Sequence, residues 1–301
     1  MPLRIAVAGV TTGLGHAIVS ALLDTPDLEV LLFTRSCSST KDLTHFTSRG
    51  AVTKQVDYSS IPSLICALDG VDTVINTISP FVDPTPALNL ITASKAAGVR
   101  RFAPSEFAFS AEGNARLNLY EPKRRTWAML KQSGLEYTSF HNGIFMDYFA
   151  FGAPKPHEGP LYMAPFFVNI AAQKATIPGT GDEKITFTTV NDVGRFVAAA
   201  VKFEGRWPEK FGMVGETTSY NQVVRDIEAV TGKKLEVEYL NKESIAAKIE
   251  ESKGDEVKFF LSQVLDVVAS GLGTVEPTLN KLAPHITVTS VKDLISKYWS
   301  T

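Results

Sequence analysis

The chain has 301 residues, of which 44% are hydrophobic, and its formal net charge is −2. A chain of this length and composition can bury a large core and divide into two lobes, and its near-zero charge excludes bulk attraction to nucleic acid or to an anionic membrane. Cys37 and Cys66 have the spacing of neither a disulfide framework nor a zinc site, so we expect no metal.

We expect a cytoplasmic protein without membrane contact. The start, Met1-Pro2-Leu3-Arg4, leads directly into an apolar strand, so no signal peptide is expected. No apolar run reaches the roughly 18 residues that a membrane span requires.

Residues 4–19 predict a strand, a glycine-rich turn and a helix, in that order. The apolar run at residues 5–8 leads into Gly9, Gly13 and Gly15, after which apolar residues recur with helical spacing. Glycine permits a tight turn and close approach of a pyrophosphate, and the start of a helix offers free N–H groups. We therefore predict a dinucleotide-binding turn, with a turn that binds nothing as the alternative.

The next predicted strand, residues 28–34, ends in Arg35 and Ser36, with Lys41 nearby and no acidic residue at its end. NAD-specific sites place a carboxylate on the ribose 2′-hydroxyl at this point. A guanidinium instead suits a 2′-phosphate, because its planar fork can donate two hydrogen bonds to phosphate oxygens. The predicted cofactor is therefore NADP(H), and the alternative for Arg35 is a solvated surface side chain.

Strand-like and helix-like patterns alternate through the first half of the chain. This alternation predicts an α/β fold with a doubly wound parallel sheet and helices on both faces. Beyond the first two strands, the expected strands cover residues 51–56, 72–78, 99–103 and 137–141, and the expected helices cover residues 39–48, 62–68, 87–97 and 122–133.

The pattern changes after Asp147, because the segment 151–165 is dense in glycine and proline. We predict a dinucleotide-binding domain over residues 1–150, with residues 183–202 packing back on it. Residues 151–301 are then a smaller α+β substrate lobe. Ligands of open α/β sheets bind at the carboxyl edge of the strands, so we expect this lobe to cover that edge.

Lys123 is the candidate catalytic residue. Pro122 suits the first position of a helix, which would place Lys123 in the first turn. A lysine suits proton transfer at pH 7 only when its pKa is lowered, and we expect the helix dipole, Arg124 and Arg125 to lower it. Tyr120 precedes Lys123 by three residues, not by the four of a Tyr-x-x-x-Lys pair. The alternative is a solvated lysine on a basic helix face.

Four motifs follow one another in the middle of the chain: Pro104-Ser105-Glu106-Phe107, Lys123, Gly134-Leu135-Glu136-Tyr137-Thr138 and Phe145-Met146-Asp147-Tyr148-Phe149. As a set they resemble the NmrA-like, isoflavone reductase-like group of atypical short-chain dehydrogenases/reductases. The resemblance covers residues 3–202. The chain departs from the group at Gly13, which falls one place late, and at Ala108, where related reductases usually have glycine.

The resemblance implies a Rossmann-type sheet and a set of cofactor contacts. In chain order these are Gly9, Thr11, Thr12, Gly13, Leu14, Gly15, Arg35, Ser36, Thr77, Ser79, Ser105, Glu106, Phe107, Lys123 and Asn142. The glycine turn would bind the pyrophosphate, Arg35 and Ser36 the 2′-phosphate, and Lys123 would be the catalytic lysine.

Together these features predict an NADPH-dependent reductase of a small, largely apolar or aromatic molecule, acting as a monomer or homodimer. It would reduce a carbonyl or a conjugated C=C bond by hydride transfer, with Lys123 as proton donor or relay. His141 is either a satisfied core histidine or a hydrogen-bond donor to the substrate. The alternative function is a non-catalytic NADP sensor that binds a protein partner, since some NmrA-like proteins resemble this chain in fold. A sugar-nucleotide epimerase is disfavoured because the Tyr-x-x-x-Lys pair is missing.

Overall fold

The computed structural model describes residues 2–11, 13–35, 43–79, 83–109, 111–157, 161, 164 and 166–300. Two predicted cofactor contacts, Thr12 and Ser36, lie outside the described residues, as does part of the helix expected at residues 39–48. No helix among the described residues is both long enough and apolar enough to cross a bilayer.

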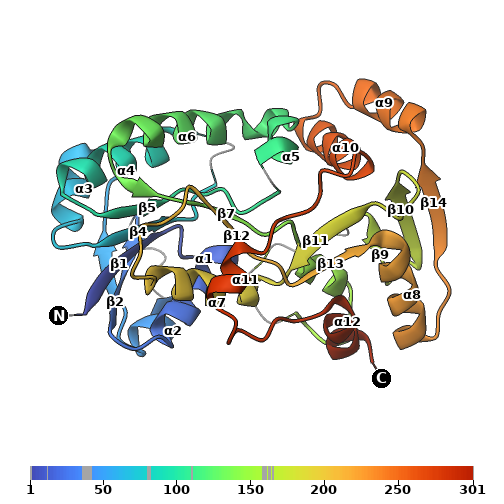
Figure 1. The fold of residues 1–301 in the computed structure, drawn as a ribbon, viewed down its shortest axis with the longest axis horizontal. Coiled ribbons are helices and arrows are strands. Elements are labelled where there is room, and N and C mark those ends of the chain that lie inside the picture. The colour runs from blue at the N-terminus through green and yellow to red at the C-terminus, as the bar shows by residue number, and fades with distance from the viewer. Residues whose placement is uncertain are drawn as a thin grey trace.

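Six parallel strands form the larger sheet, in the order β3-β2-β1-β4-β5-β6 (Figure 1). They are β1 (Leu3–Ala8), β2 (Leu28–Thr34), β3 (Val52–Gln55), β4 (Thr73–Asn76), β5 (Arg101–Ala103) and β6 (Glu136–Tyr137). The chain runs outward from β1 to β3 and then crosses back to β4, so the direction of winding reverses between β1 and β4. This is the doubly wound, Rossmann-type order, and it confirms the predicted fold class.

Helices cover both faces of this sheet because the strands are apolar on both sides. In β1, Ile5 and Val7 pack with α1 and α7, whereas Ala6 and Ala8 belong to the cluster formed with α3, α4 and α6. The helices in this half are α1 (Gly13–Leu23), α2 (Thr44–Thr47), α3 (Ile61–Ala67), α4 (Thr85–Ala96), α5 (Ala111–Ala115) and α6 (Glu121–Ser133).

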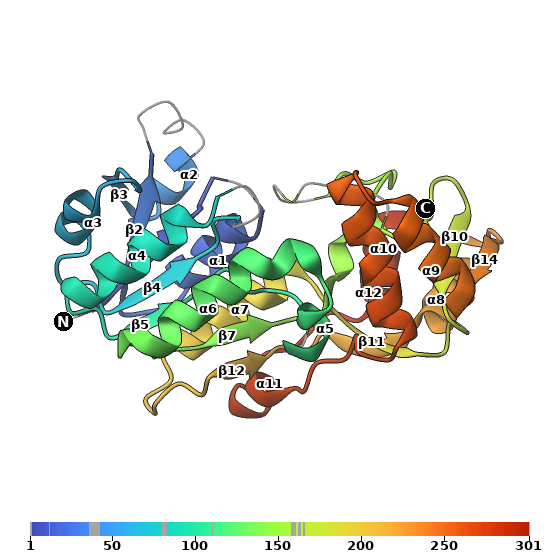
Figure 2. The same ribbon diagram turned by 90° about the horizontal axis from the view of Figure 1, so that it is seen from above.

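Much of the second half of the chain builds small sheets and helices at the other end of the molecule, where α8, α9, α10, β10 and β14 lie (Figure 2). The small sheets have the orders β14-β10-β9, β13-β11-β8 and β12-β7. Their strands are β7 (Ser139–His141), β8 (Ile144–Phe145), β9 (Val168–Asn169), β10 (Lys174–Pro178), β11 (Lys184–Thr188), β12 (Lys210–Gly212), β13 (Glu216–Ser219) and β14 (Glu236–Leu240). The helices are α7 (Val190–Val201), α8 (Tyr220–Thr231), α9 (Lys242–Glu251), α10 (Glu256–Ala269), α11 (Thr278–Leu282) and α12 (Val291–Trp299).

The two halves exchange segments rather than meeting at one linker. Helix α7 packs along α1 on the large sheet, while the strand before it, β11, pairs with β8 and β13. Strand β12 returns to pair with β7 beside the large sheet. The division near residue 150 therefore remains a prediction about how the chain is organised.

Candidate active site

The turn between β1 and α1 is closed so tightly that side chains are excluded from it. Gly9 has a φ of +89°, and a Cβ added to Gly15 would lie 2.2 Å from the carbonyl oxygen of Gly9. The hydroxyl of Thr77, just after β4, donates to the carbonyl oxygens of Ala8 at 2.8 Å and Gly9 at 3.0 Å. Only glycine fits at Gly9 and Gly15, and glycines at such a turn allow a pyrophosphate to approach the backbone closely.

The end of β2 offers a cationic side chain beside a buried phenol. Arg35 is exposed, and its positive charge acts on Tyr58, whose pKa is raised by burial and lowered by that charge. The Tyr58 hydroxyl is buried and has no hydrogen-bond partner among the described residues. The exposed guanidinium of Arg35 is chemically suited to a phosphate group.

A cavity of about 690 Å³ opens at the carboxyl edge of the large sheet. It brings together seven of the predicted site residues, namely Gly13, Leu14, Thr77, Ser79, Ser105, Phe107 and Lys123. The glycine turn, the end of β4, the segment after β5 and the start of α6 therefore meet at one cavity, as expected for a dinucleotide site at the point where winding reverses.

Other predicted contacts do not line this cavity. Gly9 and Gly15 lie within the turn itself, and Thr11 and Arg35 are exposed. Asn142 is fully buried, with its side-chain amide donating to the Gly143 carbonyl oxygen at 3.3 Å. 

Lys123 is buried at the start of α6 and is only 7% exposed. Its Nζ donates to the backbone carbonyl of Glu106 at 2.6 Å and lies 4.1 Å from the centre of the Tyr120 ring. Burial lowers the pKa of Lys123 to about 8, and the negative charge of Glu106 opposes this shift. With this pKa, the Lys123 amine can both hold and release a proton near neutral pH, as proton transfer requires.

The cause of this pKa shift differs from the expected one. Arg124 and Arg125 are exposed, and desolvation, not their charge, lowers the pKa of Lys123. The helix begins at Glu121, so Pro122 occupies its second position and Lys123 still falls in the first turn. The sequence predicted the direction of the shift correctly but attributed it to the wrong neighbours.

Glu106 and His141 are close to Lys123 but do not line the apolar cavity. Glu106 is 8% exposed, and burial raises the pKa of its carboxyl group while Lys123 and Arg124 lower it. His141 contacts the Phe109 carbonyl through Nδ1 and the Ser139 hydroxyl through Nε2 at 2.8 Å. Burial lowers the pKa of His141 to about 4, so its ring is neutral at pH 7. These contacts make His141 a satisfied interior histidine.

Aromatic rings form much of the remaining wall of the cavity, and several come from the second half of the chain. The rings are those of Phe107, Phe109, Tyr120, Phe145, Tyr148, Phe166 and Phe260. Phe260 and Val264 lie four residues apart on α10, and sequence reasoning did not place them at the site. Their i, i+4 spacing marked an apolar helix face but carried no information about what that face would cover.

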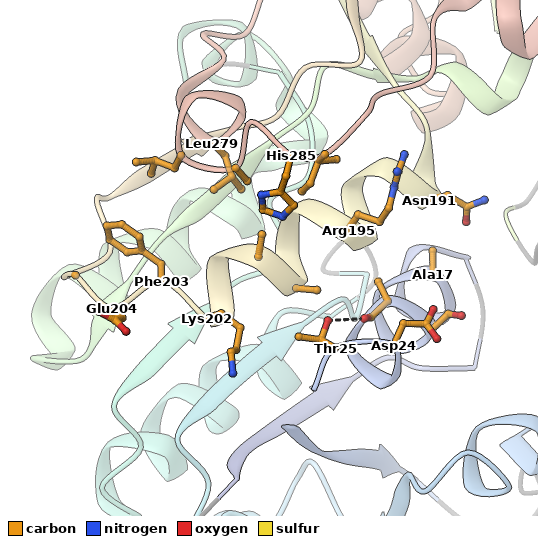
Figure 3. A pocket seen from close by; sticks show the side chains of 18 residues that line it. Ala17, Asp24, Thr25, Asn191, Arg195, Lys202, Phe203, Glu204, Leu279 and His285 are labelled. Atoms are coloured by element: carbon orange, nitrogen blue, oxygen red, sulfur yellow. Dashed lines mark hydrogen bonds between the residues drawn. The ribbon is translucent and has the colours of Figure 1, made fainter. Parts of the chain in front are cut away.

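A larger groove of about 1020 Å³ lies elsewhere, between α1, α7 and the segment that follows α11 (Figure 3). It contains none of the predicted site residues. Its charged side chains include Arg195, which pairs with the buried Asp192, and Lys202, which lies 3.8 Å from Asp27. We assign the chemistry to the smaller cavity, because it alone of these two combines the glycine turn with a buried lysine.

The chain is similar to known proteins over most of its length. A family model described as the NmrA-like family matches residues 1–277. Oxidoreductase BOA1 of Botryotinia fuckeliana is 30% identical over 238 residues, which is 77% of this chain and 77% of that protein. Quinone oxidoreductase 2 of Escherichia coli is 26% identical over 294 residues, 95% of each chain. The solved structure of AtPrR2 with NADP+ and (+)pinoresinol has a TM-score of 0.82 at 23% identity and covers 99% of both chains.

Proposed function

The chain belongs to the NmrA-like family, and we propose that it is an NADP(H)-dependent oxidoreductase that reduces a small aromatic or otherwise largely apolar molecule. One observation carries the proposal. The glycine turn, several aromatic rings and the buried Lys123 all line one cavity. Relatives named as oxidoreductases, including a quinone oxidoreductase, support an enzyme, and a structural neighbour that binds NADP+ supports the cofactor.

The turn and the cavity are suited to such a cofactor. The closed turn at Gly9 and Gly15 would leave the first N–H groups of α1 free for the pyrophosphate, and Arg35 would bind the 2′-phosphate. Ser105 and Phe107 would border the nicotinamide, which when bound supplies hydride to the substrate.

Lys123 would supply the proton that completes the reduction. Its pKa of about 8 keeps most of the amine protonated at pH 7 and still allows it to release a proton. The Glu106 carbonyl, 2.6 Å away, fixes the position of Nζ, and the Tyr120 ring stabilises the positive charge. The aromatic wall would exclude water from the reacting atoms and favour a flat, apolar carbonyl or conjugated C=C compound.

A substrate panel tests the proposal. Quinones, aromatic enones and aromatic ketones are each mixed with the protein and NADPH, and loss of nicotinamide absorbance is followed. We expect reduction of at least one aromatic class, and faster reduction with NADPH than with NADH. Tight NADPH binding without reduction of any compound in the panel would favour the NADP sensor instead.

A further inference from the structure

Lys123 and Tyr120 line two cavities. The first is the aromatic cavity described above, and the second is a smaller chamber of about 190 Å³ that is lined by Trp127 and by several polar side chains. Lys123 thus lies between two compartments. The mechanism proposed above uses only the apolar side.

The chamber leads from Lys123 toward solvent. Its inner wall is formed by buried polar side chains, Glu106, Asn114, Ser139 and His141. Its outer wall includes the exposed residues Ala115, Arg124 and Lys210. A path through the chamber therefore joins the buried amine to the surface without crossing the aromatic cavity.

The inner wall presents hydrogen-bond acceptors to the chamber. His141 Nδ1 contacts a backbone carbonyl, which can only accept, so Nδ1 carries the ring proton and Nε2 accepts from Ser139 Oγ at 2.8 Å. The Glu209 backbone carbonyl, 3.3 Å from Ser139 Oγ, is a second acceptor for the same hydroxyl. The lone pairs of Ser139 Oγ are then left to accept from another donor. Asn114 Oδ1 is buried and has no partner among the described residues, although its Nδ2 donates to the Phe109 carbonyl.

The size of the chamber and the buried polar side chains on its wall suit water. At about 30 Å³ for each molecule, a space of about 190 Å³ has room for roughly six waters. Such waters can donate to Ser139, Asn114 and Glu106 and accept from the Lys123 ammonium. An unpartnered buried oxygen such as Asn114 Oδ1 is a site where ordered water is expected.

We propose that this chamber is a water-filled proton path, through which Lys123 recovers from solvent the proton that it gives to the substrate. Ser139, Asn114 and Glu106 position the water, and His141 and the Glu209 carbonyl hold the Ser139 hydroxyl in place. The inference rests on the proposed reductase function, because it needs Lys123 to lose a proton in each turnover.

The proton balance is simple. One Nζ–H bond of Lys123 breaks as the proton passes to the substrate, and the amine becomes neutral. A new Nζ–H bond forms with a proton passed along the chamber, which takes up one proton from solvent at its outer wall. The electrons come only from the NADPH hydride of the proposed function, so each reduced substrate consumes one hydride and one proton.

A second route matters because substrate and cofactor fill the aromatic side. Once both are bound, they displace water from that cavity, and among the described residues the chamber is then the route that joins Lys123 to solvent. Turnover then depends on residues that touch neither substrate nor cofactor.

Substitutions at Ser139 test the path. Ser139→Val removes the hydroxyl and adds bulk, whereas Ser139→Thr adds bulk but keeps the hydroxyl. The matched control is Thr138→Val, which removes a neighbouring buried hydroxyl that does not line the chamber. Single-turnover and steady-state reduction are measured for each protein with the best substrate of the panel.

We expect Ser139→Val to lower steady-state kcat by about tenfold or more, a part of the 10²–10⁴-fold worth of general acid–base groups. Its single-turnover rate should stay within about twofold, because Lys123 begins each experiment protonated. Ser139→Thr and Thr138→Val should behave like the parent. Equal slowing of both phases, or no slowing in Ser139→Val, would overturn the proposal.

A crystal structure of the unmodified protein gives a readout that is independent of activity. Ordered waters that link Lys123 Nζ to Ser139 Oγ and to the outer wall are expected, and Ser139→Val should lose at least the water on Ser139. A dry chamber would overturn the proton path even if the reductase function holds. If the chamber holds ordered waters but the protein reduces no compound of the panel, the proposed reductase function is wrong.

Discussion

Replacing Gly15 with alanine tests the cofactor turn at its tightest point. The added Cβ would lie 2.2 Å from the Gly9 carbonyl oxygen and 2.7 Å from Thr77 Oγ1. Nonbonded heavy atoms prefer separations of about 3.5–4.0 Å, so the turn must open by more than an ångström. Thr77 cannot simply move aside, because its hydroxyl donates to both Ala8 and Gly9.

Overpacking a well-packed site costs about 1–3 kcal/mol, and here the obstructing atom is backbone, so we expect a loss of about 2–3 kcal/mol in the free energy of unfolding. Opening the turn also moves the first N–H groups of α1 away from the pyrophosphate. We expect NADPH affinity to fall by at least about tenfold, which corresponds to about 1.4 kcal/mol.

The assay combines urea unfolding with calorimetric titration of NADPH. Gly134→Ala is the matched control, because Gly134 ends α6 at a φ of +80° with no atom within 4 Å of an added Cβ. That change should cost about 1–2 kcal/mol of stability through backbone strain alone and leave NADPH binding intact. If Gly15→Ala bound NADPH within about twofold of the parent, the turn would not be the pyrophosphate site.

Three further predictions concern the cofactor, the lysine and the core. Arg35→Ala should weaken NADPH binding by about 1.5–3 kcal/mol, the range for a hydrogen bond to a charged group, and leave NADH unchanged; equal losses in titration calorimetry would refute the 2′-phosphate role. Because burial lowers the pKa of Lys123 to about 8, and the protonated form is the acid, kcat/KM for reduction should fall as pH rises through about 8; a profile that stays flat to pH 10 would contradict this role. Glu136→Ala removes the carboxylate 2.8 Å from the guanidinium of Arg101, whose side chain is 1% exposed, and should cost about 3–5 kcal/mol in urea unfolding. A loss below about 1 kcal/mol would show that the backbone carbonyls of Val201 and Gly205, to which Arg101 also donates, suffice.

Local patterns in the sequence located most of the large sheet. The strand expected at residues 137–141 is instead two strands, β6 in the large sheet and β7 outside it, and the short helix α5 was not predicted. Ser60, the N-cap of α3, accepts a hydrogen bond from the Ser63 backbone N–H at 3.3 Å. The glycine turn could be located because it directly follows β1, and Lys123 because it begins the helix that returns after β5; the places of both strands in a parallel sheet follow from topology.

Contacts made across the chain were not predictable in the same way. Phe260 reaches the cavity from α10, more than a hundred residues after Lys123, and no local pattern encodes that approach. Burial, which lowers the pKa of Lys123, is likewise a property of the packed molecule, so the sequence suggested the charged neighbours Arg124 and Arg125 instead. The spacing of residues in the sequence also could not show that Lys123 lines two separate cavities.

The role of Lys123 in reduction is tested most directly by Lys123→Met, compared with Lys131→Met. Lys131 lies on the same helix but is exposed, with its Nζ 5.9 Å from the Trp127 ring. Turnover of the best panel substrate and NADPH affinity are measured for both variants. We expect Lys123→Met to lower turnover by about 10²–10⁴-fold with NADPH affinity nearly retained, and Lys131→Met to match the parent. Turnover by Lys123→Met within a few-fold of the parent would contradict the assignment of the proton to Lys123.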